Sequence, residues 1–203
     1  MNLDIRTLVV GFCDTNCYVT ADRESGDALI IDPGDSADEI YAVVSGTGLT
    51  VRGIVNTHCH TDHILANGEL KDRFHCPLMI HEADAPGLTD PTMNLATLVG
   101  YRGPTSPPAD RLLRDGDEIT FGEITFQVIH TPGHTPGCIC LYTPGVLMSG
   151  DTLFASGIGR TDFPGGNYEQ ILDSIRRRLM ILPPETQVYP GHGPSTTIGR
   201  ESG

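Results

Sequence analysis

The sequence has little positive charge. Of its 203 residues, 13 are lysine or arginine and 26 are aspartate or glutamate, so the formal net charge is -13. Lys71 is the single lysine, and the one basic run, 176–178, falls in a helical pattern that is typical of a solvated helix face. Nucleic acids and anionic membranes are bound by clustered positive charge, so the sequence argues against both as partners.

Long hydrophobic runs are also lacking. No apolar stretch approaches the roughly 20 residues that cross a bilayer. The N-terminus carries Asp4 and Arg6 inside its apolar stretch and has no small-residue cleavage site, so it does not have the pattern of a signal peptide. We therefore expect a cytoplasmic protein. Its length and its 38% hydrophobic content predict one globular domain over residues 1–203.

The six cysteines do not form a pair of Cys-x-x-Cys motifs, which a structural zinc site would use. In a reducing compartment they are expected to remain thiols and to act as small buried hydrophobic residues. Cys59 lies between His58 and His60. In an extended segment, successive side chains point to opposite faces, so we expect Cys59 to point away from both histidines and not to bind a metal.

The hydrophobic pattern predicts an α/β fold in which strands precede helices in each half of the chain. Strands are expected at 3–10, 16–21, 28–31, 51–56, 77–80, 118–121, 124–129, 139–142, 146–148 and 187–189. Helices are expected after a cap at Asp35 or Ser36, with Ile40, Val43 and Val44 as the apolar face, and at 64–74 and 168–181. Residues 83–108 have no firm periodicity and predict a partly helical loop over the active-site side. Two halves of similar make-up suggest two facing sheets with helices outside.

The strongest chemical signal is the pattern His58-x-His60-x-Asp62-His63 directly after a predicted strand. His58 and His60 share one face of an extended segment, so both imidazoles can bind one ion. Asp62 and His63, where the chain turns into a helix, can face a second position. Imidazole and carboxylate together suit Zn²⁺ and similar ions.

Three further candidates each follow a predicted strand. They are His134 in a Pro and Gly turn, Asp151 in Ser-Gly-Asp-Thr, and His192 between two glycines. Such positions at strand ends are where α/β folds place their sites. The count fits two divalent ions, with His58, His60 and His134 on one, with Asp62, His63 and His192 on the other, and with Asp151 bridging them.

At this point the sequence resembles the metallo-β-lactamase superfamily, and within it the small glyoxalase II-like hydrolases. The resemblance rests on the segments 31–34, 58–63, 130–137, 149–154, 159–166 and 190–197. It implies an αββα sandwich of two mixed sheets, a hydroxide-bearing pair of metal ions and thioester substrates such as S-hydroxyacyl glutathione. Since the chain stops soon after His192, we expect no separate C-terminal substrate domain.

Segments 55–60, 136–138 and 159–163 also resemble the persulfide dioxygenases of the same superfamily. That resemblance implies one iron bound by His58, His134 and Asp151. A lactone hydrolase and a metal-binding protein without turnover are further alternatives. Segments 32–34 and 191–194 favour the hydrolase.

The preferred hypothesis is therefore a thioesterase with two metal ions, Zn²⁺ first and iron or manganese as alternatives, acting on a small thioester. Asp62 is expected to orient the nucleophile and carry its proton. Arg160 is a candidate substrate contact, although a local pair with Asp162 explains it equally well. His75, His81 and His130 are expected to have structural roles, and His130 could also orient a ligand. The sequence leaves the acyl group, the thiol carrier and the oligomeric state open.

Overall fold

The computed structural model describes residues 2–202, and two six-stranded sheets form its centre. The first sheet has the strand order β1 (Leu3–Val10), β2 (Thr15–Asp22), β3 (Asp27–Ile31), β4 (Thr50–Val55), β5 (Leu78–His81) and β6 (Arg111–Leu113). The second has the order β14 (Thr196–Thr197), β13 (Gln187–Pro190), β10 (Val146–Gly150), β9 (Ile139–Thr143), β8 (Ile124–His130) and β7 (Glu118–Phe121). Both sheets are mixed, because each contains parallel and antiparallel pairs.

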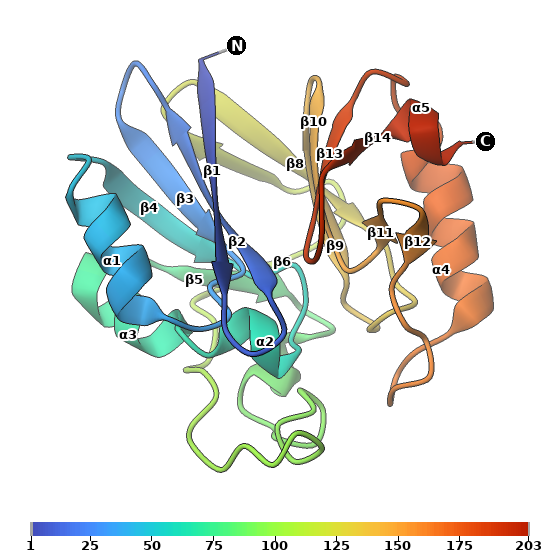
Figure 1. Ribbon diagram of the computed structural model, residues 1–203, viewed down its shortest axis with the longest axis horizontal. Helices are drawn as coiled ribbons and strands as arrows, with labels where there is room; N and C mark the ends of the chain where they lie inside the picture. Colours follow the sequence, from blue (N-terminus) through green and yellow to red (C-terminus); the bar gives the residue numbers. More distant parts are fainter. Residues whose placement is uncertain (1, 203) are drawn as a thin grey trace.

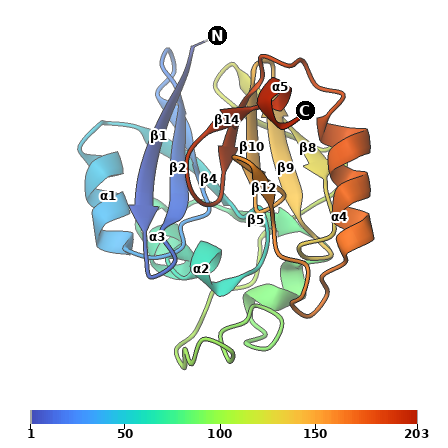
Figure 2. The same ribbon diagram turned by 45° about the vertical axis from the view of Figure 1, so that its right-hand side comes forward.

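Helices cover the outer face of each sheet. The helical segments are α1 (Ala37–Ser45), α2 (Thr61–Ile64), α3 (Asn67–Phe74), η1 (Ala85–Leu88), α4 (Tyr168–Ser174), η2 (Ile175–Leu179) and α5 (Ile198–Glu201). Figure 1 shows α1 and α3 at one side of the sheets and α4 at the other, and the turned view in Figure 2 shows the same order of layers. The predicted αββα sandwich is confirmed.

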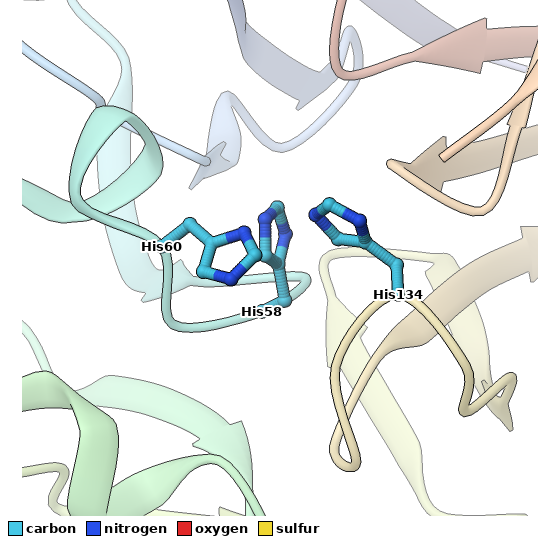
Figure 3. A group of neighbouring side chains, drawn as sticks. All are labelled: His58, His60 and His134. Atoms are coloured by element: carbon cyan, nitrogen blue, oxygen red, sulfur yellow. The ribbon is translucent and has the colours of Figure 1, made fainter. Parts of the chain in front are cut away.

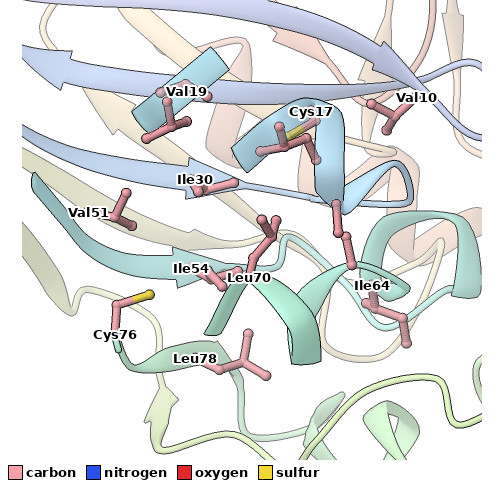
Figure 4. Packing of buried hydrophobic residues seen from close by; sticks show 14 of the residues in the cluster. Val10, Cys17, Val19, Ile30, Val51, Ile54, Ile64, Leu70, Cys76 and Leu78 are labelled. Atoms are coloured by element: carbon pink, nitrogen blue, oxygen red, sulfur yellow. The ribbon is translucent and has the colours of Figure 1, made fainter. Parts of the chain in front are cut away.

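Alternation along the strands builds this layered core. On β3, Ile30 packs toward the helices α1 and α3, whereas Leu29 and Ile31 point into the space between the sheets. The outer cluster joins Ile30 and its neighbours Ile54 and Leu78 to Leu70 of α3, as Figure 4 shows. The strands β2, β3 and β5 of the first sheet are therefore buried on both faces, as expected where helices and a second sheet cover them.

The second sheet is built in the same way. Leu147 of β10 packs outward against α4 and η2, whereas Met148 lies in the cluster between the sheets. Ile171 and Leu179 supply the helical side of that outer cluster, and both are fully buried. Apolar layers thus fix how the two sheets face each other, and with them the relative positions of the strand ends.

The helix expected over 64–74 is wrong as one element, because the chain forms α2 and α3 with a break between them. The backbone N–H of Ala66 donates to the carbonyl of Pro33 at 3.0 Å instead of continuing the helical ladder. The carbonyl of His63 accepts from the side chain of Asn56 at 3.0 Å. The N–H and carbonyl groups that would pair within a continuous helix therefore form hydrogen bonds to other parts of the fold.

Two other helix expectations need correction. The helix expected over 168–181 ends at Leu179, and its last part, η2, is π-helical, with the Met180 N–H donating to the carbonyl of Ile175 at 2.9 Å. Ser36 does precede α1, but its side chain makes no capping bond. The carboxylate of Asp35 instead accepts from the backbone N–H of Ser36.

The remaining differences are short elements. The pattern missed β6, β14 and α5, as well as a small hairpin of β11 (Leu153–Phe154) and β12 (Gly157–Ile158). Each is too short to show a period. Residues 83–108 contain the single turn η1 and otherwise irregular turns, which matches the expected partly helical loop. Within residues 2–202, no helix combines the length and the hydropathy that crossing a bilayer requires.

Candidate metal centre

All seven predicted ligands lie at or just after the C-terminal ends of strands, and the structure brings them to one place. His58 and His60 follow β4, and Asp62 and His63 lie on the short helix α2. The other three, His134, Asp151 and His192, follow β8, β10 and β13. The site therefore draws on both halves of the chain, with four side chains from the first sheet and three from the second.

His58, His60 and His134, the first ligand group, face one another closely. Their ring centroids lie 4.6 to 4.8 Å apart, and each pair meets edge to face. Figure 3 shows the rings converging, with His58 and His60 on one segment and His134 on the opposite loop. The Nε2 atoms of all three are buried and have no hydrogen-bond partner among residues 2–202. Buried nitrogens without partners are costly, and a shared metal ion would satisfy them.

The second ring nitrogen already has a partner in His134 and in His58. Nδ1 of His134 lies 2.6 Å from the carbonyl oxygen of Arg160, so it donates its proton there. Nδ1 of His58 lies 3.1 Å from the Thr57 hydroxyl, which itself donates to Asp32 at 2.7 Å and is left to accept from the ring. Both contacts leave the Nε2 lone pair free, as a metal-binding imidazole requires.

Asp62, His63 and His192, the second ligand group, lie beside the first. Nε2 of His63 is 3.3 Å from Nε2 of His192, and Oδ2 of Asp62 is 3.5 Å and 3.2 Å from these two atoms respectively. Nδ1 of His63 faces Oδ2 of Asp32 at 3.0 Å. The three side chains thus place one ligand atom each around a common point.

Asp151 lies between the two groups. Its Oδ2 is 3.6 Å from Nε2 of His134 and 3.5 Å from Nε2 of His192, and its Oδ1 is 3.5 Å from Nε2 of His63. One carboxylate therefore contacts imidazoles of both groups, which is the position that a bridging ligand needs.

The separations between ligand atoms fit metal ions. Zn²⁺ binds nitrogen and oxygen at about 2.0 to 2.2 Å, which puts tetrahedral ligands about 3.3 to 3.5 Å apart. The contacts in the second group and around Asp151 span 3.2 to 3.6 Å. These separations lie at the long end of hydrogen-bond distances and match the spacing of ligand atoms around one ion.

Electrostatics differ between the two groups. In the first, burial lowers the pKa of His58 well below its ordinary value. Burial and the neighbouring His134 lower the pKa of His60 to about 3. These imidazoles are therefore neutral at physiological pH, with lone pairs available to a metal ion.

In the second group, carboxylates reverse the effect of burial. Burial opposes protonation of His63, but Asp62, Asp151 and Asp32 outweigh it and raise its pKa to about 9. Hydrogen bonds to Asp151 and Asp62 likewise raise the pKa of His192 to about 10 against the effect of burial. The carboxylates thus favour positive charge here, and a divalent ion would supply it in place of two protons.

Two glycines allow the ligand segments to approach each other. A Cβ atom at Gly191 would lie 2.1 Å from Oδ1 of Asp151, and one at Gly34 would lie 1.6 Å from the carbonyl oxygen of Asp62. Any side chain at either position would displace a ligand-bearing segment. Gly34 and Gly191 are therefore required by close packing at the site itself.

The remaining predicted residues have local partners. Arg160 lines the cavity beside the ligands, but its guanidinium makes two hydrogen bonds to Asp162, at 2.9 and 2.7 Å. His81 and His130 stack with centroids 4.1 Å apart, and Nε2 of His130 contacts the carbonyl of Pro136 at 2.9 Å in the loop that carries His134. His75 is exposed at the end of α3.

Sequence reasoning missed two buried aspartates that support the ligands. In the sequence Asp32 stands out only as part of the segment 31–34, yet its carboxylate accepts from the backbone N–H and the hydroxyl of Thr57 and faces His63. Asp84 lies in the loop without periodicity. Its Oδ2 accepts from the Cys59 N–H at 3.0 Å and the Thr135 hydroxyl at 2.7 Å, and its Oδ1 accepts from the Gly137 N–H at 2.6 Å. Asp84 therefore ties the segment of His58 and His60 to the loop of His134.

We expect Asp84→Asn to weaken metal binding at the first ligand group by about 10 to 100-fold, because the amide cannot accept all three hydrogen bonds. Competition with a chromophoric chelator measures this affinity. Asp110→Asn is the matched control, since Asp110 also accepts from a backbone N–H, that of Leu78, but lies beside Lys71 at a surface cavity that none of the seven ligands lines. Wild-type affinity in Asp84→Asn would contradict the positioning role.

Cys59→Ser is expected to retain the full metal content. The Cys59 sulfur packs against Gly87, since a Cβ at Gly87 would lie 2.4 Å from it, and it borders a second cavity with Asp84. Burial and Asp84 raise the pKa of the thiol well above its ordinary value, and the sulfur faces this second cavity and not the one that the ligands line. Elemental analysis measures the metal content of Cys59→Ser and of His60→Ala, and the second variant should lose metal. Loss of a metal equivalent in Cys59→Ser would show that the thiol is a ligand.

Comparison with known proteins gives the family. Residues 10–192 match the sequence profile of the metallo-beta-lactamase superfamily. The chain is 36% identical to the probable metallo-hydrolase YqgX of Bacillus subtilis, over 95% of this chain and 92% of that protein. It is 34% identical to the hydroxyacylglutathione hydrolase GloC of Haemophilus influenzae, over 99% of this chain and 95% of that one.

Solved structures agree with this result. The B3 metallo-beta-lactamase BLEG-1 superposes with a TM-score of 0.92 at 39% identity, over 98% of this chain and 96% of that one. TTHA1623, solved in a di-iron-bound form, gives 0.87 at 37% identity over 97% and 96% of the two chains. ETHE1 from Myxococcus xanthus gives 0.83 at 33% identity over 98% and 81%. The chain therefore belongs to the metallo-β-lactamase superfamily, and it is a metal-dependent hydrolase of that superfamily.

Proposed function

We propose that this chain hydrolyses thioesters with a pair of divalent metal ions, in the manner of a hydroxyacylglutathione hydrolase. The observation that carries the proposal is the position of His192, whose Nε2 lies 3.2 to 3.5 Å from Asp62, His63 and Asp151. A second complete ligand group has no use in an enzyme with one metal ion. The similarity to GloC supports a thioester as the substrate.

The metal pair would supply water acidified to a pKa of about 7 and a Lewis acid for the carbonyl oxygen. We assign His58, His60 and His134 to one ion, Asp62, His63 and His192 to the other, and Asp151 to both. The ligand types suit Zn²⁺ first, and iron or manganese are alternatives. The di-iron form of TTHA1623 supports a paired site and keeps iron among the candidates.

Asp62 is the proposed catalytic residue. Its carboxylate borders the cavity and accepts from the Thr15 hydroxyl at 3.2 Å, which orients it. Despite the opposing effect of burial, His63 and His192 hold the pKa of Asp62 below its ordinary value, so it is ionised and can accept a proton from the attacking water. The departing thiol needs little protonation, because an ordinary thiol pKa is about 8.5.

A mono-iron persulfide dioxygenase is the second candidate, supported by the segments 55–60, 136–138 and 159–163. It would use His58, His134 and Asp151 and leave the second ligand group without a role. A lactone hydrolase would use the same metal pair on an ester.

The test is metal content and turnover of the same preparation. The chain is loaded with Zn²⁺, Fe²⁺ or Mn²⁺ and assayed with S-lactoylglutathione, other thioesters and lactones, beside oxygen uptake on glutathione persulfide. We expect two ions per chain and thioester turnover without oxygen uptake. One iron per chain together with oxygen consumption would contradict the proposal and indicate the dioxygenase. Preferred lactone turnover would replace thioesters as the substrate class, and full metal content without any turnover would indicate a metal-binding protein.

A further inference from the structure

A cavity of about 320 Å³ opens beside the two ligand groups. His60, Asp62, His134, Asp151 and His192 form its floor. Its walls come from three segments that are distant in the sequence: the tip of the β1 and β2 hairpin, the loop 83–108 and the segment after β10. The main wall residues are Phe12, Leu95, Val99, Phe154, Arg160 and Phe163. A group attached to a carbonyl carbon at the ligands would therefore enter this cavity.

The walls are apolar and carry no available positive charge. Among the described residues that line the cavity, Arg160 is the single lysine or arginine, and both hydrogen bonds of its guanidinium go to Asp162. The guanidinium also lies over the ring of Phe163, 4.2 Å from its centroid. A ligand carboxylate would find on these walls a single guanidinium that is already paired with Asp162, so its desolvation would be poorly compensated.

The mouth of the cavity is unusually apolar for exposed surface. Phe12 is 60% exposed and Val99 is 49% exposed, although both are large hydrophobic residues. Most of the exposed large hydrophobic side chains of the described chain lie on the same two segments, with Val9 beside Phe12 and with Leu98 and Tyr101 beside Val99. Exposed apolar patches beside a pocket mark binding surfaces.

We propose that the cavity binds the acyl group of the substrate, and that this group is an uncharged, apolar chain of about butanoyl to octanoyl length. This inference rests on the proposed thioester hydrolysis. The acyl chain stays uncharged throughout hydrolysis, whereas the leaving sulfur gains negative charge and is better placed toward water than against apolar walls. The thiol carrier, glutathione included, is then not recognised through its charges.

The first experiment compares acyl chains on one neutral carrier. The metal-loaded full chain is assayed with acetyl, butanoyl and hexanoyl thioesters of N-acetylcysteamine. Each fully buried methylene is worth about fourfold, so we expect kcat/KM to rise by about tenfold or more from acetyl to hexanoyl. The hexanoyl thioester of glutathione should be turned over no faster than that of N-acetylcysteamine. A flat acyl series, or a clear preference for the glutathione carrier, would overturn the inference while leaving thioester hydrolysis intact.

Variants then assign the effect to the walls. Phe12→Ala and Val99→Ala should each reduce the hexanoyl-to-acetyl ratio of kcat/KM by about three to tenfold, because each removes apolar area. Ile181→Ala is the matched control, since Ile181 is 73% exposed and lies outside the cavity lining. Unchanged ratios in both wall variants would contradict the assignment to this cavity.

A binding measurement separates this inference from the proposed function. Calorimetry compares hexanoate with acetate on the metal-loaded chain, and we expect hexanoate to bind about tenfold or more tightly. If no thioester is hydrolysed, the proposed function fails, and the inference about the cavity is judged by this ratio alone. Equal affinities would overturn it.

Discussion

Asp151→Ala is expected to lose metal at both positions and to lower kcat/KM for thioesters by at least about 100-fold. The size of the effect follows from geometry, because the Asp151 carboxylate contacts His134 of one ligand group and His63 and His192 of the other. Loss of a hydrogen-bonding neighbour of a ligand typically weakens a metal site by about 10 to 100-fold, and loss of a shared ligand should exceed that.

Elemental analysis after gel filtration measures the metal content of Asp151→Ala, and circular dichroism checks that it is folded. Asp173→Ala is a suitable control, because Asp173 is an exposed aspartate that pairs with Arg177 on the helical surface. Near-normal metal stoichiometry in Asp151→Ala would remove the bridging assignment. Loss of one ion with retention of the other would assign Asp151 to a single position.

His192→Ala is the second large effect, and it separates the two leading functions. In the proposed hydrolase it should empty or loosen the second position, leave the ion at His58, His60 and His134 in place, and reduce thioester turnover by at least about 10 to 100-fold. In a mono-iron dioxygenase the same change should leave the single metal bound, because His58, His134 and Asp151 are untouched.

A titration of metal content against free metal concentration resolves the two positions in His192→Ala. His75→Asn is the matched control, since His75 is exposed and has a positive φ of 50°, which asparagine tolerates. A wild-type chain with one iron, unchanged by His192→Ala and consuming oxygen with persulfide, would overturn the proposed function.

The longer strands could be predicted because their residues alternate or are continuously apolar. β7 matches its expected range, and β8, β9 and β10 differ from theirs by one or two residues at one end. The break between α2 and α3 could not be predicted. It depends on the carbonyl of Pro33 and the side chain of Asn56, which lie beside this segment only in the folded structure. Local propensity contains no information about such partners.

The same distinction holds for the site. The ligands were predictable because several of one chemical type follow strand ends in a fixed order, and the structure brings all seven together. Asp84 was not predictable, since nothing near it in the sequence distinguishes it from a loop aspartate. Its role arises from contacts with Cys59, Thr135 and Gly137, which are 25 to 53 residues away. Supporting residues of this kind are properties of the folded chain.

The division of the ligands between the two sheets has a thermodynamic consequence. In the unfolded chain His58 and His192 are far apart, so the complete set of ligand atoms exists only in the native state. A ligand that binds only the native state stabilises it by RT ln(1 + [L]/Kd), which is about 2.7 kcal/mol when the free metal is 100 times its Kd. We therefore expect the midpoint of unfolding to rise with the free metal concentration. A chelator, which removes the metal, should destabilise the native state. Two preparations of this protein have comparable melting temperatures only at the same metal activity.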